Sequence, residues 1–457
     1  MTFRYIVLLA TLLSGCLNLN DGAPPPPPDV NPLGRATSSF AQTLYDELAA
    51  KQVGAIYSPF SAHAVLSLTY MGARGTTAGE MKSALQLSNV QDPHATYRVL
   101  ITSLNSALNI KLLTANGMWI HPDFQVLQQF KDDAATNYFA KAENIEFAAQ
   151  GGPEAPINEW VANKTENKIK DLLPPGTLTP DTSIVLVNTI FFNSTWKKQF
   201  LEYNTKRVNF YKANGKTAPV ELMNQVDDLD VKESALENSD LLRIPFTNER
   251  FSFYVLLPKS ASGLEAVEKK FIGNNFDVNG LFAGLTRRRV DVSLPKFNLT
   301  ATMKLNEALK KLGMSEAFSS SANFSGISNS SIMISDVIQK AVIEVRETGT
   351  VAAAATAVIA VRTSAVIQRE TPFVFKADHP FIFWIRDDTT GTVLFQGKFA
   401  DPAVKEININ TVRIKYGAHQ EGRASIFNIT FLTIGKEPDK NLELPFMNMI
   451  LGFVVIL

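Results

Sequence analysis

The sequence EVRETGTVAAAATAVIAVRTSAV, residues 344–366, decides how the rest of the chain is interpreted. Charged side chains stand at its start, and then none occurs from Thr348 to Val361. Alanine is the best helix former, so the run could be a helix. Its Thr, Val and Ile residues lower that preference and favour an extended segment or a buried strand. A Gly-Thr pair at the entrance gives the backbone freedom to turn.

The composition of the chain is that of an ordinary globular protein. It has 457 residues, 45% of them hydrophobic, and its 44 basic and 44 acidic residues cancel. A chain of this length folds as one large domain or as two to three ordinary ones. Because no net charge favours a polyanion, we expect no nucleic-acid partner. One Cys in the whole chain excludes an internal disulfide.

The N-terminal sequence MTFRYIVLLATLLSGC predicts export. A short basic start and an apolar stretch are typical of a signal peptide, residues 1–15. The small residues before Cys16 resemble a bacterial lipobox, which predicts lipidation of Cys16 and anchoring to a bacterial membrane. Leu17 favours the outer membrane, and an ordinary signal peptide with an extracellular product is the alternative. Residues 16–35 contain five consecutive prolines and would form a stiff tether.

The pattern from residue 36 to residue 402 is that of a single folded domain. Residues 38–50 and 157–173 carry apolar side chains at helical spacing. Strand-like runs, rich in β-branched and aromatic residues, follow at 182–193, 250–258, 289–299 and 335–345. Several lack alternation, which indicates strands covered on both faces. Early helices and late strands predict an α+β fold with a large central sheet.

No sequence motif indicates catalysis or a cofactor. The chain has no HExxH, no phosphate-binding Gly loop, no GxSxG and no His or Cys pair at metal spacing. Its five histidines are scattered, and His63 and His379 are interpreted as structural. We therefore expect a protein that is not an enzyme and has no metal or other cofactor.

Several segments, in order along the chain, resemble the serpin superfamily of serine protease inhibitors from about residue 36 to residue 402. They are YSPFSAHAVLSLTYMGARGTTAGEM (57–81), LVNTIFFNSTWKKQF (186–200), VSLPKFNL (292–299) and FKADHPFIFWI (375–385). The resemblance implies helices around a large central sheet, smaller sheets and an exposed reactive loop. It also implies that a protease cuts this loop and is trapped as an acyl-enzyme while the loop inserts into the sheet.

The resemblance makes the opening stretch the hinge of the reactive loop. The implied hinge residues are Glu347, Gly349, Thr350, Ala352, Ala353, Ala354, Ala355 and Thr356. Alternate residues from Thr350 onward would face inward after insertion, so each must be small or apolar. Non-inhibitory relatives tend to carry charged, bulky or Pro residues there, whereas this chain has GTVAAAAT at residues 349–356.

Two further sites are implied by the same resemblance. The shutter, which governs opening of the sheet, would consist of Ser58, Ser61, Asn188 and Gln339. Gln339 stands where His is common in the family, and Gln still donates and accepts hydrogen bonds. Trp196 would lie in the breach, at the top of the sheet where insertion begins.

The reactive bond is predicted by two counts that differ. Counting forward from Glu347 gives Thr363-Ser364, or Arg362-Thr363 for a loop one residue shorter. Counting back from Pro380 gives Arg369-Glu370 as an alternative. We favour the forward count because inhibition requires a fixed length of inserted strand. An Arg before the bond suits a trypsin-like protease, and Thr363 suits an elastase- or subtilisin-like one.

Alternatives remain for the function and for the C-terminus. The principal expectation is a monomeric inhibitor of serine proteases, with cysteine proteases as a further target class. A non-inhibitory serpin that acts as a binding or chaperone-like protein is the alternative. Residues 403–457 extend beyond the usual end of the family. Their apolar tail is short for a membrane span, and it could pack on the body, contact a membrane or be a gene-model artefact.

Overall fold

The computed structural model describes residues 28–49, 54–272, 276–350, 371–415 and 426–434. For residues 406, 408–415 and 426–434 only the backbone is described. The predicted signal peptide, Cys16, the loop residues 351–370 and the tail 435–457 lie outside these ranges.

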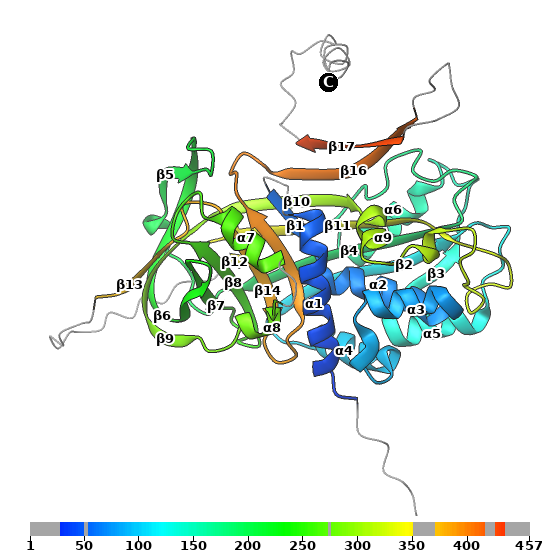
Figure 1. The fold of residues 1–457 in the computed structure, drawn as a ribbon, viewed down its shortest axis with the longest axis horizontal. Coiled ribbons are helices and arrows are strands. Elements are labelled where there is room, and N and C mark those ends of the chain that lie inside the picture. The colour runs from blue at the N-terminus through cyan, green and yellow to red at the C-terminus, as the bar shows by residue number, and fades with distance from the viewer. Residues whose placement is uncertain (1–27, 50–53, 273–275, 351–370, 416–425, 435–457) are drawn as a thin grey trace, which may run out of the picture.

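The central sheet has eight strands in the order β17-β16-β10-β11-β12-β4-β2-β3 (Figure 1). Its strands are β2 (Ile110–Ile120), β3 (Lys141–Asn144), β4 (Ile184–Thr195), β10 (Phe297–Lys304), β11 (Ile334–Arg346), β12 (Gly349–Thr350), β16 (Glu406–Lys415) and β17 (Ile426–Ile434). β11 pairs directly with β4 in parallel along most of its length. At the end of β11 the short strand β12 lies between these two strands and pairs antiparallel with both.

A second sheet of nine strands packs beside the central one. Its strands are β1 (Gly54–Tyr57), β5 (Lys206–Tyr211), β6 (Thr217–Leu236), β7 (Ser239–Pro245), β8 (Phe251–Pro258), β9 (Thr286–Pro295), β13 (Phe373–Lys376), β14 (Phe381–Asp387) and β15 (Val393–Phe399). β13 follows the undescribed loop and pairs in parallel with β9. The loop therefore leaves from the central sheet and returns to the second one.

The helices surround the two sheets (Figure 1). They are α1 (Asn31–Leu48), α2 (Pro59–Gly72), α3 (Gly75–Ala84), α4 (Pro93–Asn105), α5 (Gln128–Tyr138), α6 (Glu154–Lys164), α7 (Leu264–Ile272), α8 (Val278–Leu281) and α9 (Asn306–Lys311), with short 3₁₀ turns at Leu87–Asn89, Glu202–Asn204 and Glu316–Phe318. α2 is buried around almost its whole circumference, between β4 and β2 on one side and β15 on the other. This burial explains its apolar sequence.

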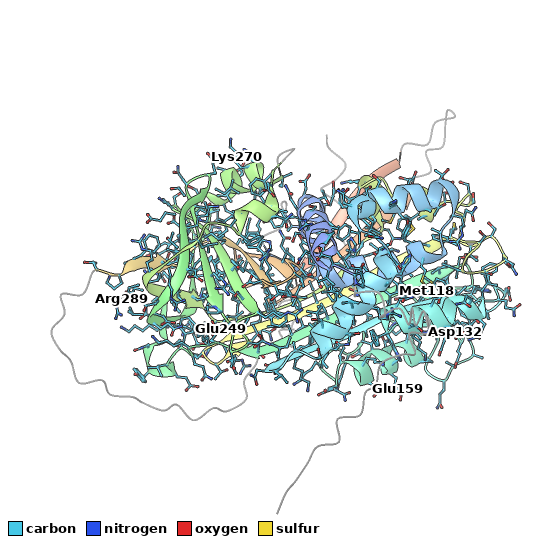
Figure 2. All side chains as sticks on the ribbon, turned by 90° about the horizontal axis from the view of Figure 1, so that it is seen from below. Met118, Asp132, Glu159, Glu249, Lys270 and Arg289 are labelled. Atoms are coloured by element: carbon cyan, nitrogen blue, oxygen red, sulfur yellow. The ribbon has the colours of Figure 1, made fainter. Side chains whose placement is uncertain are left out.

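Two hydrophobic clusters lie on opposite faces of the central sheet. The large one joins α1 and α2 to both sheets, and the smaller one packs α6 and the segment after it on the other face. The second includes Ile157, Val161, Val187, Phe191 and Ile338. In Figure 2 side chains fill the space between the ribbons, and labelled charged residues such as Asp132 and Lys270 lie at the margin. β4 is thus covered on both faces, as its lack of apolar–polar alternation predicts.

Two predictions of local structure were wrong in extent. The helix expected over residues 157–173 ends at Lys164, because Glu166 and Asn167 have left-handed φ angles of 48° and 61°. The apolar residues beyond the helix end remain buried in the smaller cluster. The strand expected over residues 289–299 is two strands, β9 and β10, which separate at Lys296 and belong to different sheets.

Within the described residues, no helix is long and apolar enough to cross a membrane. No group of three or more His, Cys, Asp or Glu side chains in these same ranges is placed to hold a metal ion.

Candidate functional site: the hinge and the gap between β11 and β4

The hinge is a tight hairpin in which β11 turns back as β12. Arg346 pairs with Gly349, so only Glu347 and Thr348 form the loop. Gly349 has a φ of 142°, and a Cβ atom there would lie 2.1 Å from the carbonyl oxygen of Ser194. Both the backbone angle and this close approach require glycine.

Thr350, the last described residue before the loop, is completely buried. It is paired with Val345 of β11 and with Ser194 of β4. Its hydroxyl accepts a hydrogen bond from the Ser194 N–H at 3.1 Å and lies 3.3 Å from the Ser194 carbonyl oxygen, to which it donates. The first residue of the predicted inward-facing set therefore already occupies a position inside the central sheet.

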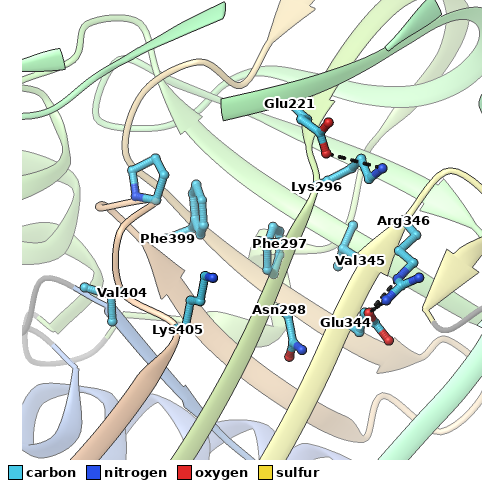
Figure 3. Close-up of a pocket in the computed structure, with 11 residues that line it drawn as sticks. Glu221, Lys296, Phe297, Asn298, Glu344, Val345, Arg346, Phe399, Val404 and Lys405 are labelled. Atoms are coloured by element: carbon cyan, nitrogen blue, oxygen red, sulfur yellow. Dashed lines mark hydrogen bonds and ion pairs between the residues drawn. The ribbon is translucent and has the colours of Figure 1, made fainter. Parts of the chain in front are cut away.

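The hinge turn is held by an ion pair. The Glu347 carboxylate lies 3.1 Å from Lys296 Nζ and accepts a hydrogen bond from the Thr205 hydroxyl at 2.8 Å. Burial alone would raise the pKa of Glu347, but hydrogen bonds from its own N–H, Thr205 and Lys296 hold that pKa below its usual range. Figure 3 shows Lys296 also beside Glu221, at 3.4 Å. Burial works to lower the pKa of Lys296, and the two carboxylates outweigh it and raise that pKa.

Trp196, the predicted breach residue, binds the other side of the hinge turn. Its indole N–H donates to the Arg346 carbonyl at 2.9 Å, and its backbone N–H donates to the Thr348 carbonyl at 3.0 Å. The ring stacks on Phe246 with a centroid distance of 4.8 Å and an interplanar angle of 6°. The end of β4 and the start of the loop are therefore connected through one buried aromatic residue.

The four predicted shutter residues are all buried and share one hydrogen-bond network. The Gln339 amide donates to Asn188 Oδ1 at 2.6 Å and to the Ser58 carbonyl at 3.0 Å, and it accepts from the Ser58 N–H at 2.9 Å. Asn188 in turn donates to the Ser61 carbonyl at 2.9 Å. Ser58 also caps α2, because its hydroxyl accepts from the Ser61 N–H. The network therefore joins β11, β4 and the start of α2.

A fifth member of this network, Asn116 of β2, was missed from the sequence. Asn116 lies opposite Asn188, which lies opposite Gln339, so three amide side chains form one row across the sheet. The Asn116 amide oxygen accepts hydrogen bonds from Asn188 and from the Ser61 hydroxyl. The signal that could have found it is an Asn within the mostly apolar run LLTANGMWI, residues 112–120.

The remaining predicted site residues cannot be placed. Ala352, Ala353, Ala354, Ala355 and Thr356 of the hinge, the candidate bond residues Arg362, Thr363, Ser364 and Arg369, and the lipidation residue Cys16 lie outside the described residues.

Histidine chemistry plays no part in the described hinge and shutter. His63 is buried in α2, where Nε2 contacts the Leu85 carbonyl at 2.8 Å and Nδ1 contacts the Tyr97 hydroxyl at 2.5 Å. Burial lowers the pKa of His63 to about 4, against an opposing effect of the Leu85 hydrogen bond. The ring is neutral at physiological pH and serves to join α2 to neighbouring helices.

Comparisons with known proteins concern the family and the fold of the chain. The family model described as "Serpin (serine protease inhibitor)" matches residues 35–402. A serpin-like protein of Thermococcus kodakarensis is 37% identical over 380 residues, which cover 81% of this chain and 86% of the archaeal protein. Serpin B6 of Macaca fascicularis is 33% identical over 377 residues, or 81% of this chain and 99% of its own length.

A solved serpin structure has the same fold as this chain. The crystal structure of Serpin48 from the insect Tenebrio molitor superposes with a TM-score of 0.73 at 30% sequence identity. The superposition covers 81% of this chain and 98% of the insect protein. Residues 403–457 lie beyond the family match.

Proposed function

The chain belongs to the serpin family, and on that premise we propose that it inhibits serine proteases by trapping them through insertion of its reactive loop. Members of this family are in general protease inhibitors rather than catalytic enzymes. In the proposed mechanism a protease cuts a bond in residues 351–370 and forms an ester between its serine and the new carboxyl end. The loop then enters the central sheet between β11 and β4 before that ester is hydrolysed.

The observation that carries the proposal is the position of Thr350 between β11 and β4. Two residue pairs, those of Gly349 and Thr350, are already formed on each side. Below it, β11 and β4 are joined directly to each other, so the path of the loop is closed beyond the first step. This arrangement is the one expected if the first residues of the loop strand have entered the sheet and the direct β11–β4 pairing blocks further insertion.

The register of β12 predicts where each following residue would lie. Thr350 pairs with Val345 and Ser194, so an unbroken antiparallel strand would bring Thr356 opposite both Gln339 and Asn188. These two residues are partners in the present β11–β4 pairing. Insertion would therefore replace the Gln339–Asn188 hydrogen bond with contacts to Thr356, whose hydroxyl suits that polar row.

The other face of the inserting strand would pass beneath α6. Residues 351, 353, 355 and 357 alternate with the inward set. They would meet the face that carries Phe191, Val187 and Ile338, which α6 and the segment after it cover. Small side chains on both faces of the loop are consistent with a strand that must slide through a covered gap.

The target protease is proposed from the loop sequence. We place the cut in residues 362–364, with Arg362 before the bond for a trypsin-like enzyme and Thr363 for an elastase- or subtilisin-like one. An acidic specificity pocket would pair with the Arg362 guanidinium. Cysteine proteases, which also form acyl-enzymes, are a secondary class.

The test is a denaturing gel after mixing the protein with trypsin and, separately, with subtilisin. A band at the summed mass that survives denaturant supports trapping, and mass spectrometry of the released peptide then identifies the bond. A peptide that begins at Thr363 or Ser364 agrees with the forward count, and one that begins at Glu370 overturns it. Cleavage without any covalent complex would favour the binding or chaperone-like alternative.

The site of action follows from the N-terminal sequence alone. We propose export and lipid anchoring through Cys16, with residues 16–35 as a spacer between the membrane and the domain. The protein would then meet proteases at the bacterial surface. An unlipidated extracellular form is the alternative, and metabolic labelling with a fatty acid distinguishes the two.

A further inference from the structure

The sequence beyond the family match adds two strands to the edge of the central sheet. β16 pairs in parallel with β10 from Thr300 to Met303, opposite Glu406 to Ile409 (Figure 1). The Thr300 N–H donates to the Lys405 carbonyl at 3.0 Å. β17 then pairs antiparallel with β16 over nine residue pairs. Without these residues β10 would be the edge strand of the sheet.

The root of this extension is anchored in the core. Val404 is 4% exposed and Ile407 is 2% exposed. Both side chains reach Gly54 at the start of β1, where an added Cβ atom would lie 3.4 Å from Val404 and 3.7 Å from Ile407. Two buried apolar side chains, one just before β16 and one within it, therefore fix the start of the extension to the body.

The extension covers only part of the β10 edge. Residues Phe297 to Leu299 have no partner on the β16 side among the described residues. A cavity of about 410 Å³ opens there, between the root at Val404 and Lys405 and the end of β11 (Figure 3). The edge of β10 is therefore paired from Thr300 to Met303 and open from Phe297 to Leu299 among the described residues.

We propose that residues 403–405, β16 and β17 cap the β10 edge and thereby prevent a strand from a second copy of the chain from pairing with it. An unpaired edge strand presents backbone N–H and C=O groups that pair with any available extended segment. The chain itself supplies such a segment, because residues 351–361 are uncharged, contain no Pro and are rich in β-branched residues. This proposal does not depend on the proposed trapping of proteases.

The experiment disrupts the cap in the full-length chain. Ile407→Asp places a carboxylate at a buried position of the root, where an unpaired charge is strongly disfavoured. Ile409→Pro removes a backbone donor of β16, since in a parallel ladder that begins with Thr300 and Lys405 the N–H of Ile409 faces β10. Ala403→Asp is the matched control, because it introduces the same carboxylate at an exposed position of the same segment.

Two measurements are made on each variant after incubation below its melting temperature. Light scattering on a sizing column gives the oligomeric state. Amide hydrogen exchange gives the state of the cap, because the N–H groups of Thr300 and Thr302 face β16 whereas that of Ala301 faces β11. Ala301 therefore reports on whether the sheet itself remains folded.

The expected result in both cap variants is loss of protection at Thr300 and Thr302 in the monomer fraction, retained protection at Ala301 and progressive loss of the monomer peak. The parent and Ala403→Asp stay monomeric. The proposal is overturned if the cap variants stay monomeric while Thr300 and Thr302 exchange freely, or if the variants associate while those two amides remain protected in the monomer fraction. It is also overturned if the parent associates as fast as the variants.

Discussion

Replacing Gln339 with Leu should loosen the closed gap between β11 and β4. The substitution keeps a side chain of similar size in a position that is 1% exposed, but it removes all three amide hydrogen bonds. The Ser58 carbonyl keeps a partner, since it also accepts from the Ala62 N–H at 3.1 Å. The Ser58 N–H and one lone pair of Asn188 Oδ1 each lose their hydrogen-bond partner.

The magnitude follows from these two groups. A buried polar group that loses its partner costs about 1–3 kcal/mol, so the free energy of unfolding should fall by about 2–6 kcal/mol. Burial of the leucine side chain offsets roughly 1 kcal/mol of this. The loop-inserted form loses less, because insertion already breaks the Gln339–Asn188 bond. The Gln339→Leu substitution should therefore destabilise the uncleaved form selectively and speed its spontaneous conversion to an inserted or associated form.

The assay is thermal unfolding of the uncleaved and the loop-cleaved protein, with the rate of loss of trapping activity at constant temperature. Thr189→Val is the matched control. Thr189 is the next residue of β4, completely buried, and its hydroxyl has no hydrogen-bond partner among the described residues. The control should be neutral or slightly stabilising. If Gln339→Leu, Thr189→Val and the parent have equal melting temperatures, the hydrogen bonds of Gln339 do not hold the gap between β11 and β4 closed, and the reasoning is refuted.

Four further predictions concern the hinge, the loop and the anchor. Thr350→Arg should convert the protein from inhibitor to substrate, because a guanidinium would be buried without a partner between β11 and β4; undiminished covalent complex on a gel would contradict this. Cutting the loop should raise the melting temperature, since an inserted strand completes backbone pairing and buries apolar surface; an unchanged melting temperature would favour the non-inhibitory alternative. The pKa of Glu347 is lower in the folded protein than its usual value. This carboxylate therefore stabilises the fold at any pH above its unfolded-state pKa, and the stabilisation is lost as the pH falls through its folded-state pKa. Lys296→Met should weaken that acid dependence in a melting series from pH 7 to about pH 3, and a series identical to that of the parent would count against the ion pair. Cys16→Ser should move the protein from the membrane to the soluble fraction; if it still sediments with membranes, the apolar tail 444–457 becomes the candidate anchor.

The sequence alone was sufficient to predict the family and the main architecture. Segment order, the uncharged run after Glu347 and the strand-like runs all indicated an α+β serpin fold, and the comparisons confirmed it. Such signals are local, because each depends on side-chain type and spacing within a few residues. The same reasoning failed where a chain reversal depends on φ angles, as at Glu166, and where one run of strand residues divides between two sheets, as at Lys296.

The partners of each site residue were decided only by the tertiary structure. Asn116, Asn188 and Gln339 are far apart in sequence, and only the register of three strands brings them into one row. Likewise, no local sequence pattern specifies that β16 pairs with β10 rather than with another strand. Side-chain type and spacing determined which residues could form the strands, the hinge and the shutter. Which strand lies beside which was fixed by packing and backbone hydrogen bonding over the whole domain, because those interactions join residues that local sequence does not connect.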